Sequence, residues 1–317
     1  MTTAPAPLSP ALAAWRYRQA WVKALRPFSF TIAVVSCALG AELAWLDGRG
    51  DAARAALVLV AGVLLQAGVN LVNDFHEFKQ GRVDDKLPEL GVFGAARTAL
   101  EWSIFAGGLA CFALVVPIGL WLVAEAGAPL LWLGALGLVG AYAYTGEPLN
   151  YKRRGLAVVL VFWLMGVLMI AGSYLAVAAT WSTTAAWRAV PVSALVSLLL
   201  LSNELRDAED DARHGIRTLT VRLGYDRTVA LWWALVALAY GSAVGLWGAG
   251  LLPPPVLLVL TLPALRDVAR LLRVPRERRR PLPPLTAKLH LAFGVAYLAT
   301  AAWPAVGATL AAVLPLP

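Results

Sequence analysis

Long apolar stretches separated by short polar ones dominate the chain and predict membrane-spanning helices. A helix needs about 20 apolar residues, at about 1.5 Å per residue, to cross the hydrocarbon core of a bilayer. Nine stretches approach this length, at about 28–46, 53–75, 100–124, 128–145, 157–179, 188–204, 227–248, 251–266 and 289–314. The eighth is the shortest, and prolines both open and interrupt it. The pattern predicts an all-α integral membrane protein with about nine transmembrane helices.

A Pro-rich start and an amphipathic segment precede the first of these stretches. Tryptophan and tyrosine are interleaved with Arg and Lys over residues 12–25, as in a helix that lies in the headgroup region. Pro27 is expected to end this helix, because proline removes a backbone donor and favours a break. We therefore expect a tail and an interfacial helix over 1–27, followed by one transmembrane domain over 28–317.

Composition and charge support this class of protein. Of the 317 residues, 60% are hydrophobic and 15% are charged, which excludes an ordinary soluble domain. The net charge is +8, and 24 of the 27 Lys and Arg residues lie in the N-terminal segment or in loops after even-numbered helices. This asymmetry places those loops in the cytoplasm, so it explains the charge without nucleic acid as a partner. We expect a multi-pass protein of the cell inner membrane, in contact with membrane lipids.

An acidic cluster ends the second apolar stretch, where a bilayer-length helix rarely becomes so polar. If helical geometry persists, its amides and carboxylates recur at i, i+3, i+4 and i+7 on one face. They are Asn70, Asn73, Asp74 and Glu77. Carboxylates on a transmembrane segment are costly, so this face predicts a functional site at the cytoplasmic boundary.

A second cluster of the same chemistry ends the sixth apolar stretch, with Asn203, Asp207 and Asp211 at i, i+4 and i+8. A solvated helix end explains either cluster alone, but not two clusters at matching positions. Two facing groups of oxygen ligands need a cation between them, and Mg²⁺ binds carboxylates together with substrate phosphates. The sequence therefore predicts a central cavity, open to the cytoplasm, that binds a Mg²⁺-bridged diphosphate.

The matched clusters also predict an internal repeat. Helices two and six correspond, so helices one to four and five to eight would be two copies of a four-helix unit, over 28–150 and 155–270, with the ninth helix added. The cytoplasmic loop 142–155 joins the two copies. Its tyrosines and basic residues either serve as a positive-inside loop or supply cations and hydroxyls to a diphosphate.

The two clusters resemble the Asp-rich motifs of the UbiA superfamily of intramembrane prenyltransferases, and the resemblance spans most of the chain. The first reads Asn70-x-x-Asn73-Asp74-x-x-Glu77-x-x-x-Gly81-x-x-Asp84, and the second reads Asn203-x-x-Arg206-Asp207-x-x-x-Asp211. Three further motifs, Arg26-Pro27, Tyr144-Thr-Gly-x-Pro148 and Arg154-Gly155-Leu156, are most similar to the branch that prenylates 1,4-dihydroxy-2-naphthoate in menaquinone synthesis. The chain departs from that branch at Glu77, Glu204, Ile216 and Val158, which stand where it commonly has Asp, Asn, Lys and Glu.

The resemblance implies the roles of individual residues. Mg²⁺ would be bound by Asp74, Glu77, Asp84, Asp207 and Asp211. Catalysis would depend on Asp74 and Asp207 together with Asn70 and Asn203, while Asn73 would help to orient ligands. The diphosphate of a polyprenyl substrate would contact Lys79, Arg82, Lys152, Arg206, Arg217 and Tyr144. Ionisation then yields an allylic cation that an aromatic acceptor attacks, inside a cavity whose candidate aromatic walls are Phe162, Trp163 and Tyr174.

Two other interpretations remain open at this point. A terpene cyclase, or a transferase with a different acceptor, would use the same fold and the same diphosphate site. An ion-coupled transporter, from a different functional class, also carries paired intramembrane carboxylates in repeated units. Depth separates the classes, because coupling ions bind near the midplane whereas these acids lie at helix ends beside abundant Arg.

Overall fold

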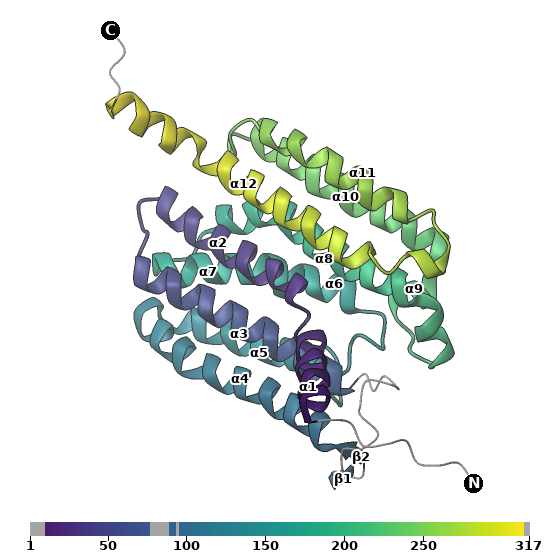
Figure 1. Ribbon diagram of the computed structural model, residues 1–317. Helices are drawn as coiled ribbons and strands as arrows, with labels where there is room; N and C mark the ends of the chain where they lie inside the picture. Colours follow the sequence, from purple (N-terminus) through teal and green to yellow (C-terminus); the bar gives the residue numbers. More distant parts are fainter. Residues whose placement is uncertain (1–9, 77–88, 93–94, 314–317) are drawn as a thin grey trace, which may run out of the picture.

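The computed structural model describes residues 10–76, 89–92 and 95–313, which form a bundle of helices (Figure 1). The helices are α1 (Pro10–Leu25), α2 (Phe30–Leu46), α3 (Ala52–His76), α4 (Ala99–Ala126), α5 (Ala128–Ala143), α6 (Ala157–Val161), α7 (Leu168–Ala178), α8 (Thr183–Arg213), α9 (Leu219–Leu223), α10 (Tyr225–Gly248), α11 (Leu262–Leu271) and α12 (Leu282–Val313). A π-helical turn, Phe162–Val167, joins α6 to α7. Short 3-10 turns cover Pro27–Ser29, Val256–Thr261 and Arg276–Arg278.

The helices confirm an integral membrane protein with a helical fold. Within the described residues, seven helical segments are long and apolar enough to cross a bilayer. All nine predicted stretches overlap helices, but the count of nine spans is not confirmed. One predicted span, α5, has only 16 residues. Another is a 3-10 turn followed by the 10-residue α11, because three consecutive prolines precede it and Pro263 fits only the first turn of a helix.

One small element departs from the all-α prediction. Strands β1 (Glu89–Val92) and β2 (Ala95–Thr98) pair antiparallel as a short hairpin after α3. Thr98 then begins α4 with a capping box, in which its side chain accepts from the backbone of Glu101 and the Glu101 carboxylate accepts from the backbone of Thr98.

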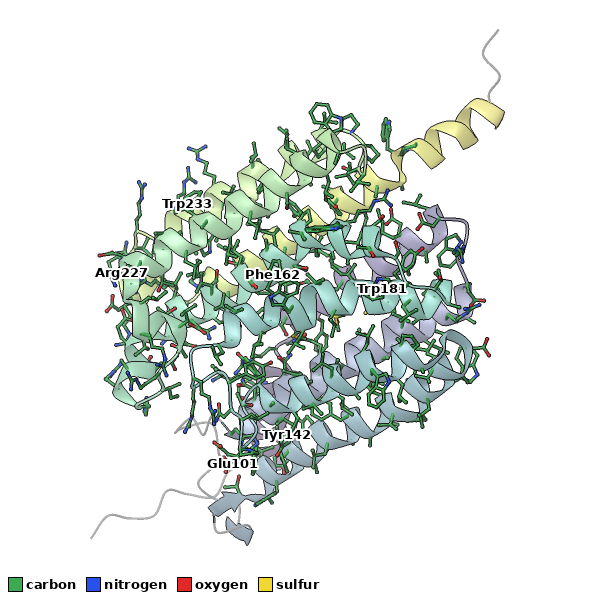
Figure 2. The ribbon with its side chains drawn as sticks, turned by 180° about the vertical axis from the view of Figure 1, so that it is seen from behind. Glu101, Tyr142, Phe162, Trp181, Arg227 and Trp233 are labelled. Carbon is green, nitrogen blue, oxygen red and sulfur yellow. The ribbon has the colours of Figure 1, made fainter. Side chains whose placement is uncertain are left out.

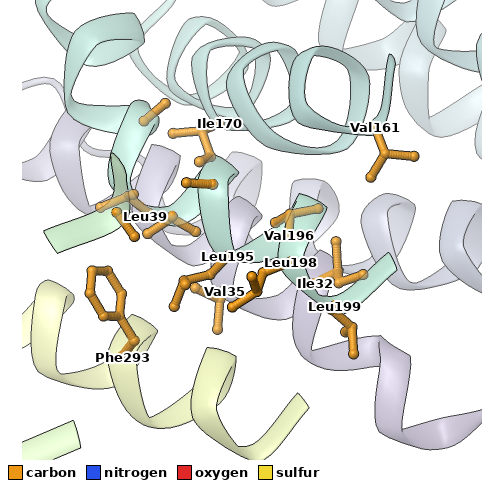
Figure 3. Packing of buried hydrophobic residues seen from close by; sticks show 14 of the residues in the cluster. Ile32, Val35, Leu39, Val161, Ile170, Leu195, Val196, Leu198, Leu199 and Phe293 are labelled. Atoms are coloured by element: carbon orange, nitrogen blue, oxygen red, sulfur yellow. The ribbon is translucent and has the colours of Figure 1, made fainter. Parts of the chain in front are cut away.

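Helix α8 lies at the centre of the bundle, packed against α2, α10 and α12. Its residues 191–202 are buried on every face, as expected of an apolar helix surrounded by other helices. Leu195, Leu198 and Leu199 lie in one cluster with residues of α2, α7 and α12 (Figure 3). The outer helices instead expose large apolar side chains such as Trp132 and Leu260, and a surface of this kind faces lipid.

The bundle has two distinct ends. Helix α1, the β1–β2 hairpin and α9 lie at one end, and the last turns of α12 extend beyond the other (Figure 1). Seen from behind, Glu101, Tyr142 and Arg227 lie toward the first end and Trp181 toward the opposite one (Figure 2). We call the first the motif end, because both polar clusters occur there.

Candidate active site

A cavity of about 230 Å³ opens among α2, α3, α5, α7 and α8, and residues of both clusters line it. Its lining is largely aliphatic, with leucine, isoleucine, valine and methionine side chains from the surrounding helices. Its polar lining residues at the motif end are Arg26, Ser29, Gln66, Asn70, Tyr144, Tyr151 and Asn203. Open space lies beside Gly134 and Gly137 of α5, since a Cβ at either position would meet no atom within 4 Å. The shape suits a molecule with a polar head and a long apolar tail.

The end of α3 brings Asn70, Asn73 and Asp74 into the interior, with exposed fractions of 5%, 1% and 8%. Asn70 Nδ2 donates to the Leu25 carbonyl at 2.7 Å and to Ser29 Oγ at 2.8 Å. Asn70 Oδ1 accepts from Gln66 Nε2 at 3.2 Å. This amide therefore binds the connection between α1 and α2. The remaining predicted residues of the first cluster, Glu77, Lys79, Arg82 and Asp84, lie outside the described residues.

At the end of α8 the same motif has different partners. Asn203 Nδ2 donates to the Leu199 carbonyl at 3.1 Å, within its own helix. Its Oδ1 is buried and accepts no hydrogen bond from the part of the chain that the structure describes. Arg206 donates to both carboxylate oxygens of Asp207, at 2.8 and 2.6 Å, so this arginine orients the acid. Asn203, unlike Asn70, keeps an oxygen available at the cavity.

Glu204, where the resemblance led us to expect Asn, ties α8 to α9. Its Oε2 accepts from the Thr220 amide at 2.9 Å and from the Thr220 hydroxyl at 3.2 Å, and its carboxylate is buried. Thr218 caps the start of α9 by accepting from Val221. Glu204 therefore fixes the turn that carries Arg217. Arg217 itself is exposed and does not line the cavity.

Other acids of α8 anchor its end to the basic segment before α12. Arg276 donates to Asp210 at 2.6 Å, and Arg279 donates to Glu209 at 2.9 Å. The Arg279 guanidinium also lies 4.0 Å from the centre of the Tyr225 ring. These contacts give part of the basic segment 273–280 a structural role in addition to its contribution to the positive-inside asymmetry.

The loop between α5 and α6 adds a buried cation. Lys152 is 9% exposed, and its Nζ lies 5.6 Å from the centre of the Tyr144 ring. The Tyr144 ring meets that of Tyr151 edge-on, with centroids 5.5 Å apart. Burial, which is the main cause, and the charge of Arg26 together lower the pKa of Lys152 to about 8, against the opposing effect of Asp211 and Asp207. The structure thus groups Lys152 with Arg26 and the second cluster.

The structure corrects one expectation and adds residues that the sequence motifs did not single out as ligands. Phe162, Trp163 and Tyr174 do not line the cavity. Trp163 is 53% exposed on the outer surface, and Tyr174 donates to Asp47 at 2.7 Å beyond the end of α2. The aromatic lining is instead Phe28, Tyr144 and Tyr151. The cavity also has three polar lining residues that were not predicted, Arg26, Ser29 and Gln66. Of these, only Arg26 belongs to a motif noted in the sequence, the Arg-Pro pair before the first transmembrane helix.

The carboxylates Asp74, Asp207 and Asp211 are not among the residues that line the cavity. Within the described residues, no three His, Cys, Asp or Glu side chains are grouped closely enough to bind a metal. Carboxylate and amide oxygens are nevertheless the ligands that Mg²⁺ prefers, and the buried Oδ1 of Asn203 is such an oxygen, with no hydrogen-bond donor among the described residues. The available residues therefore fit a hard divalent cation.

Comparison with known proteins identifies the family. The model of the UbiA prenyltransferase family matches residues 33–290, which is most of the chain. The chain belongs to the UbiA prenyltransferase family. Membership confirms the resemblance seen in the motifs, and it makes the protein an intramembrane prenyltransferase rather than an ion-coupled transporter.

Curated relatives of this UbiA-family chain cover most of it. A "1,4-dihydroxy-2-naphthoate octaprenyltransferase" of Mycobacterium tuberculosis is 32% identical over 220 residues, 69% of this chain and 75% of the relative. A protein of the same name from Escherichia coli is 32% identical over 65% of this chain and 69% of its own. "UbiA prenyltransferase domain-containing protein 1" of Gallus gallus is 27% identical over 90% of this chain and 85% of its own.

Solved structures of UbiA-family proteins share the fold. A digeranylgeranylglyceryl phosphate synthase gives a TM-score of 0.59 at 12% identity, over 90% of this chain and 98% of the other. A UbiA homolog from Archaeoglobus fulgidus bound to GPP and Mg²⁺ gives 0.58 at 15% identity, over 88% of this chain and 99% of the other. At these identities the likeness establishes the helical architecture alone.

Proposed function

We propose that this enzyme transfers an isoprenyl group from a polyprenyl diphosphate to 1,4-dihydroxy-2-naphthoate, in a Mg²⁺-dependent step of menaquinone synthesis. The observation that carries the proposal is the cavity, whose polar end at the two motifs continues into an aliphatic interior. The acceptor is supported by the names of the 32% identical relatives and by the Tyr144–Pro148 and Arg154–Leu156 motifs.

The carboxylates are proposed to hold the cation. Asp74, Glu77, Asp84, Asp207 and Asp211 would bind Mg²⁺, and the buried Oδ1 of Asn203 would add an oxygen or orient a bound water. When bound, Mg²⁺ supplies positive charge that stabilises the departing diphosphate. The Archaeoglobus fulgidus homolog, solved with GPP and Mg²⁺, supports the choice of a divalent cation.

The remaining polar residues are proposed to bind the diphosphate. Lys152 is buried beside Tyr144. In this low-dielectric environment a protonated amine would attract an anion more strongly than it does in water. Lys79, Arg82 and Arg217 would add positive charge around the head group. Arg206 would act chiefly on Asp207, because both of its hydrogen bonds already orient that carboxylate.

The chain's part in the chemistry then follows from the cavity. The bond between the allylic carbon and the diphosphate oxygen breaks, diphosphate leaves, and a bond forms between that carbon and a ring carbon of the acceptor. The ring then loses the substituent at the attacked carbon, a proton or, at the carboxyl-bearing position, CO₂, and becomes aromatic again. The faces of Tyr144 and Tyr151 would stabilise the allylic cation by about 0.5–2 kcal/mol each. The aliphatic wall would exclude the water that quenches such a cation. The enzyme would lie in the inner membrane of the cell. The distribution of Lys and Arg residues supports an orientation in which the motif end faces the cytoplasm.

The domain organisation is part of the proposal. Residues 28–150 and 155–270 would be two copies of a four-helix unit, and residues 1–27 would hold an interfacial helix ahead of them. The equivalent places of Asn70 at the end of α3 and Asn203 at the end of α8 support this repeat.

Turnover by the purified protein tests the function. Protein in detergent would be incubated with Mg²⁺, a labelled polyprenyl diphosphate, and either 1,4-dihydroxy-2-naphthoate or a panel of other aromatic acceptors. We expect a prenylated naphthoate product, and no product when EDTA replaces Mg²⁺. Diphosphate release without any acceptor would instead indicate a terpene cyclase, and product with a different acceptor only would overturn the assignment of naphthoate.

A further inference from the structure

Gln66 brings a buried carbonyl oxygen to the wall of the cavity. It lies on α3, one turn before Asn70, and it is among the residues that line the cavity. The residue is 3% exposed, and its Oε1 accepts no hydrogen bond from the part of the chain that the structure describes. A buried acceptor without a donor is costly. An oxygen of this kind beside a cavity therefore indicates a ligand that donates a hydrogen bond.

The orientation of the Gln66 amide is fixed by its neighbours. A backbone carbonyl can only accept, so Asn70 must direct its Nδ2 at the Leu25 carbonyl, 2.7 Å away. Asn70 Oδ1 is then left as the acceptor for Gln66 Nε2, at 3.2 Å, and the same nitrogen also donates to Ser29 Oγ at 3.3 Å. A flipped Gln66 amide would set two carbonyl oxygens against each other. The free atom of Gln66 is therefore its oxygen, a pure acceptor.

A metal ion bound by the acidic clusters does not account for this oxygen. Asp74, the next proposed ligand on α3, follows Gln66 by eight residues, which is about 12 Å along the helix axis. One Mg²⁺ lies only about 2 Å from each of its oxygen ligands, so the two side chains cannot share it. Asp207 and Asp211 are not among the residues that line the cavity, and the Glu204 carboxylate accepts from Thr220.

The chemistry of the substrates leaves one partner. Ionised diphosphate oxygens are acceptors only, and a prenyl tail has no polar hydrogen. The aromatic acceptor alone carries hydroxyl donors. In 1,4-dihydroxy-2-naphthoate the C1 hydroxyl lies next to the carboxylate and donates to it within the molecule, whereas the C4 hydroxyl is free to donate to the protein.

We propose that Gln66 is a specificity-determining residue, whose Oε1 accepts a hydrogen bond from the C4 hydroxyl of the aromatic acceptor. The identity of the acceptor rests on the proposed function. An aromatic molecule without this hydroxyl would leave the buried oxygen unpaired, so the site rejects it. The position of Gln66 also places the acceptor ring one helical turn deeper in the cavity than Asn70.

Binding of three naphthoates tests the proposal without requiring turnover. Calorimetry under nitrogen would measure the affinity of the detergent-purified enzyme for 1,4-dihydroxy-2-naphthoate, 1-hydroxy-2-naphthoate and 4-hydroxy-2-naphthoate. Mg²⁺ and an unreactive thiolodiphosphate analogue of the prenyl substrate would be present throughout. We expect wild type to bind 1-hydroxy-2-naphthoate, which lacks the C4 hydroxyl, about tenfold more weakly than the dihydroxy compound, a difference of about 1.4 kcal/mol.

Two variants assign this preference to the Gln66 oxygen. Gln66→Met keeps the length of the side chain but lacks the oxygen, so it should bind the dihydroxy compound and 1-hydroxy-2-naphthoate equally. It should still lose about tenfold for 4-hydroxy-2-naphthoate, which retains the C4 hydroxyl. Ser29→Ala is the matched control, because it disturbs the same hydrogen-bond network and leaves Gln66 Oε1 in place. It should keep the tenfold preference whatever its overall affinity.

The outcomes separate the inference from the function on which it rests. Equal affinities in wild type would mean that the oxygen serves only solvent, and a tenfold preference that persists in Gln66→Met would assign the hydroxyl to another residue; either result overturns the inference. If wild type binds none of the three naphthoates, the proposed acceptor is wrong and the inference falls with it. If the preference depends on Gln66 but no naphthoate is prenylated, the inference stands and the proposed function fails.

Discussion

The end of α3 and the end of α8 carry the same Asn-x-x-x-Asp spacing, yet the two asparagines have different environments. Asn70 is bound on all sides by Leu25, Ser29 and Gln66. Within the described part of the chain, Asn203 bonds to its own helix alone and leaves a buried oxygen at the cavity. Matched spacing therefore predicts that two residues share a place in a repeat, but the elements packed around them decide what each one does.

The two ends are also anchored differently. The α8 end is tied to α9 through Glu204 and to the segment before α12 through Asp210 and Glu209. The α3 end is tied to the chain that precedes it, through Asn70. If the account is correct, substitutions at equivalent positions will have unequal and distinguishable effects.

The largest effect is expected where the two ends act alike. Asp74→Asn and Asp207→Asn should each lower prenyl transfer at least about 100-fold, or roughly 2.7 kcal/mol of transition-state stabilisation, because each removes a proposed Mg²⁺ ligand. Asp210→Asn is the control on the same helix, since its carboxylate pairs with Arg276 at the protein surface. The measurement is Mg²⁺-dependent turnover by monodisperse variants, and near-wild-type activity in either of the first two would contradict the metal assignment.

The anchoring of α8 should appear in stability. Glu204→Ala leaves the amide and hydroxyl of Thr220 without their buried acceptor, and should destabilise the protein by about 1–3 kcal/mol. Thr220→Val removes only the hydroxyl and should cost less. Thermal unfolding in detergent measures the difference, and an unchanged melting temperature in Glu204→Ala would mean that the contact does not hold α9.

Substitutions of the two asparagines should change different kinetic parameters, and not merely the same parameter to different extents. Asn203→Ala should lower turnover about tenfold and raise the Mg²⁺ concentration needed for half-maximal rate, because it removes an oxygen on the metal side. Asn70→Ala should instead raise KM for the prenyl diphosphate at saturating Mg²⁺, because it removes the hydrogen bonds that hold the α1–α2 connection beside the polar end of the cavity. Titrations of both ligands on both variants separate them, and identical profiles would refute the asymmetry.

The smallest effect concerns the protonation of Lys152. Because burial lowers its pKa to about 8, the amine is charged below pH 8 and becomes neutral as the pH rises above it. We expect kcat/KM for the prenyl diphosphate to fall a few-fold, roughly, as the pH rises through this value. Lys152→Arg keeps its charge over that range and should give a flat profile. A parallel decline in both proteins would assign the pH dependence to another group.

Much of the fold could be predicted from the sequence, because bilayer thickness and hydrophobic length constrain each helix locally. Pro27 was expected to end the first helix, and α1 ends at Leu25. The eighth stretch was harder, because its prolines leave a 3-10 turn and a short helix where hydropathy alone suggests a span.

The candidate site was less predictable, because its hydrogen bonds join distant segments. Asn70 donates to Ser29 and Leu25, which lie 41 and 45 positions away in the sequence, and helical periodicity cannot predict such distant partners. Aromatic side chains gave no reliable guide either, since Trp163 faces outward while Tyr151, in a polar loop, lines the cavity. Residue type indicated the chemistry, but only the packing of α1, α2 and the 144–156 loop showed which residues reach the cavity.

The most direct test of the account is an experimental structure of the enzyme with Mg²⁺ and an unreactive thiolodiphosphate analogue of the prenyl substrate. The account predicts a diphosphate held between the ends of α3 and α8, with Mg²⁺ on Asp74 and Asp207 and the isoprenyl tail in the cavity beside Leu164 and Met165. A diphosphate bound away from either motif, or a tail outside this cavity, would contradict it.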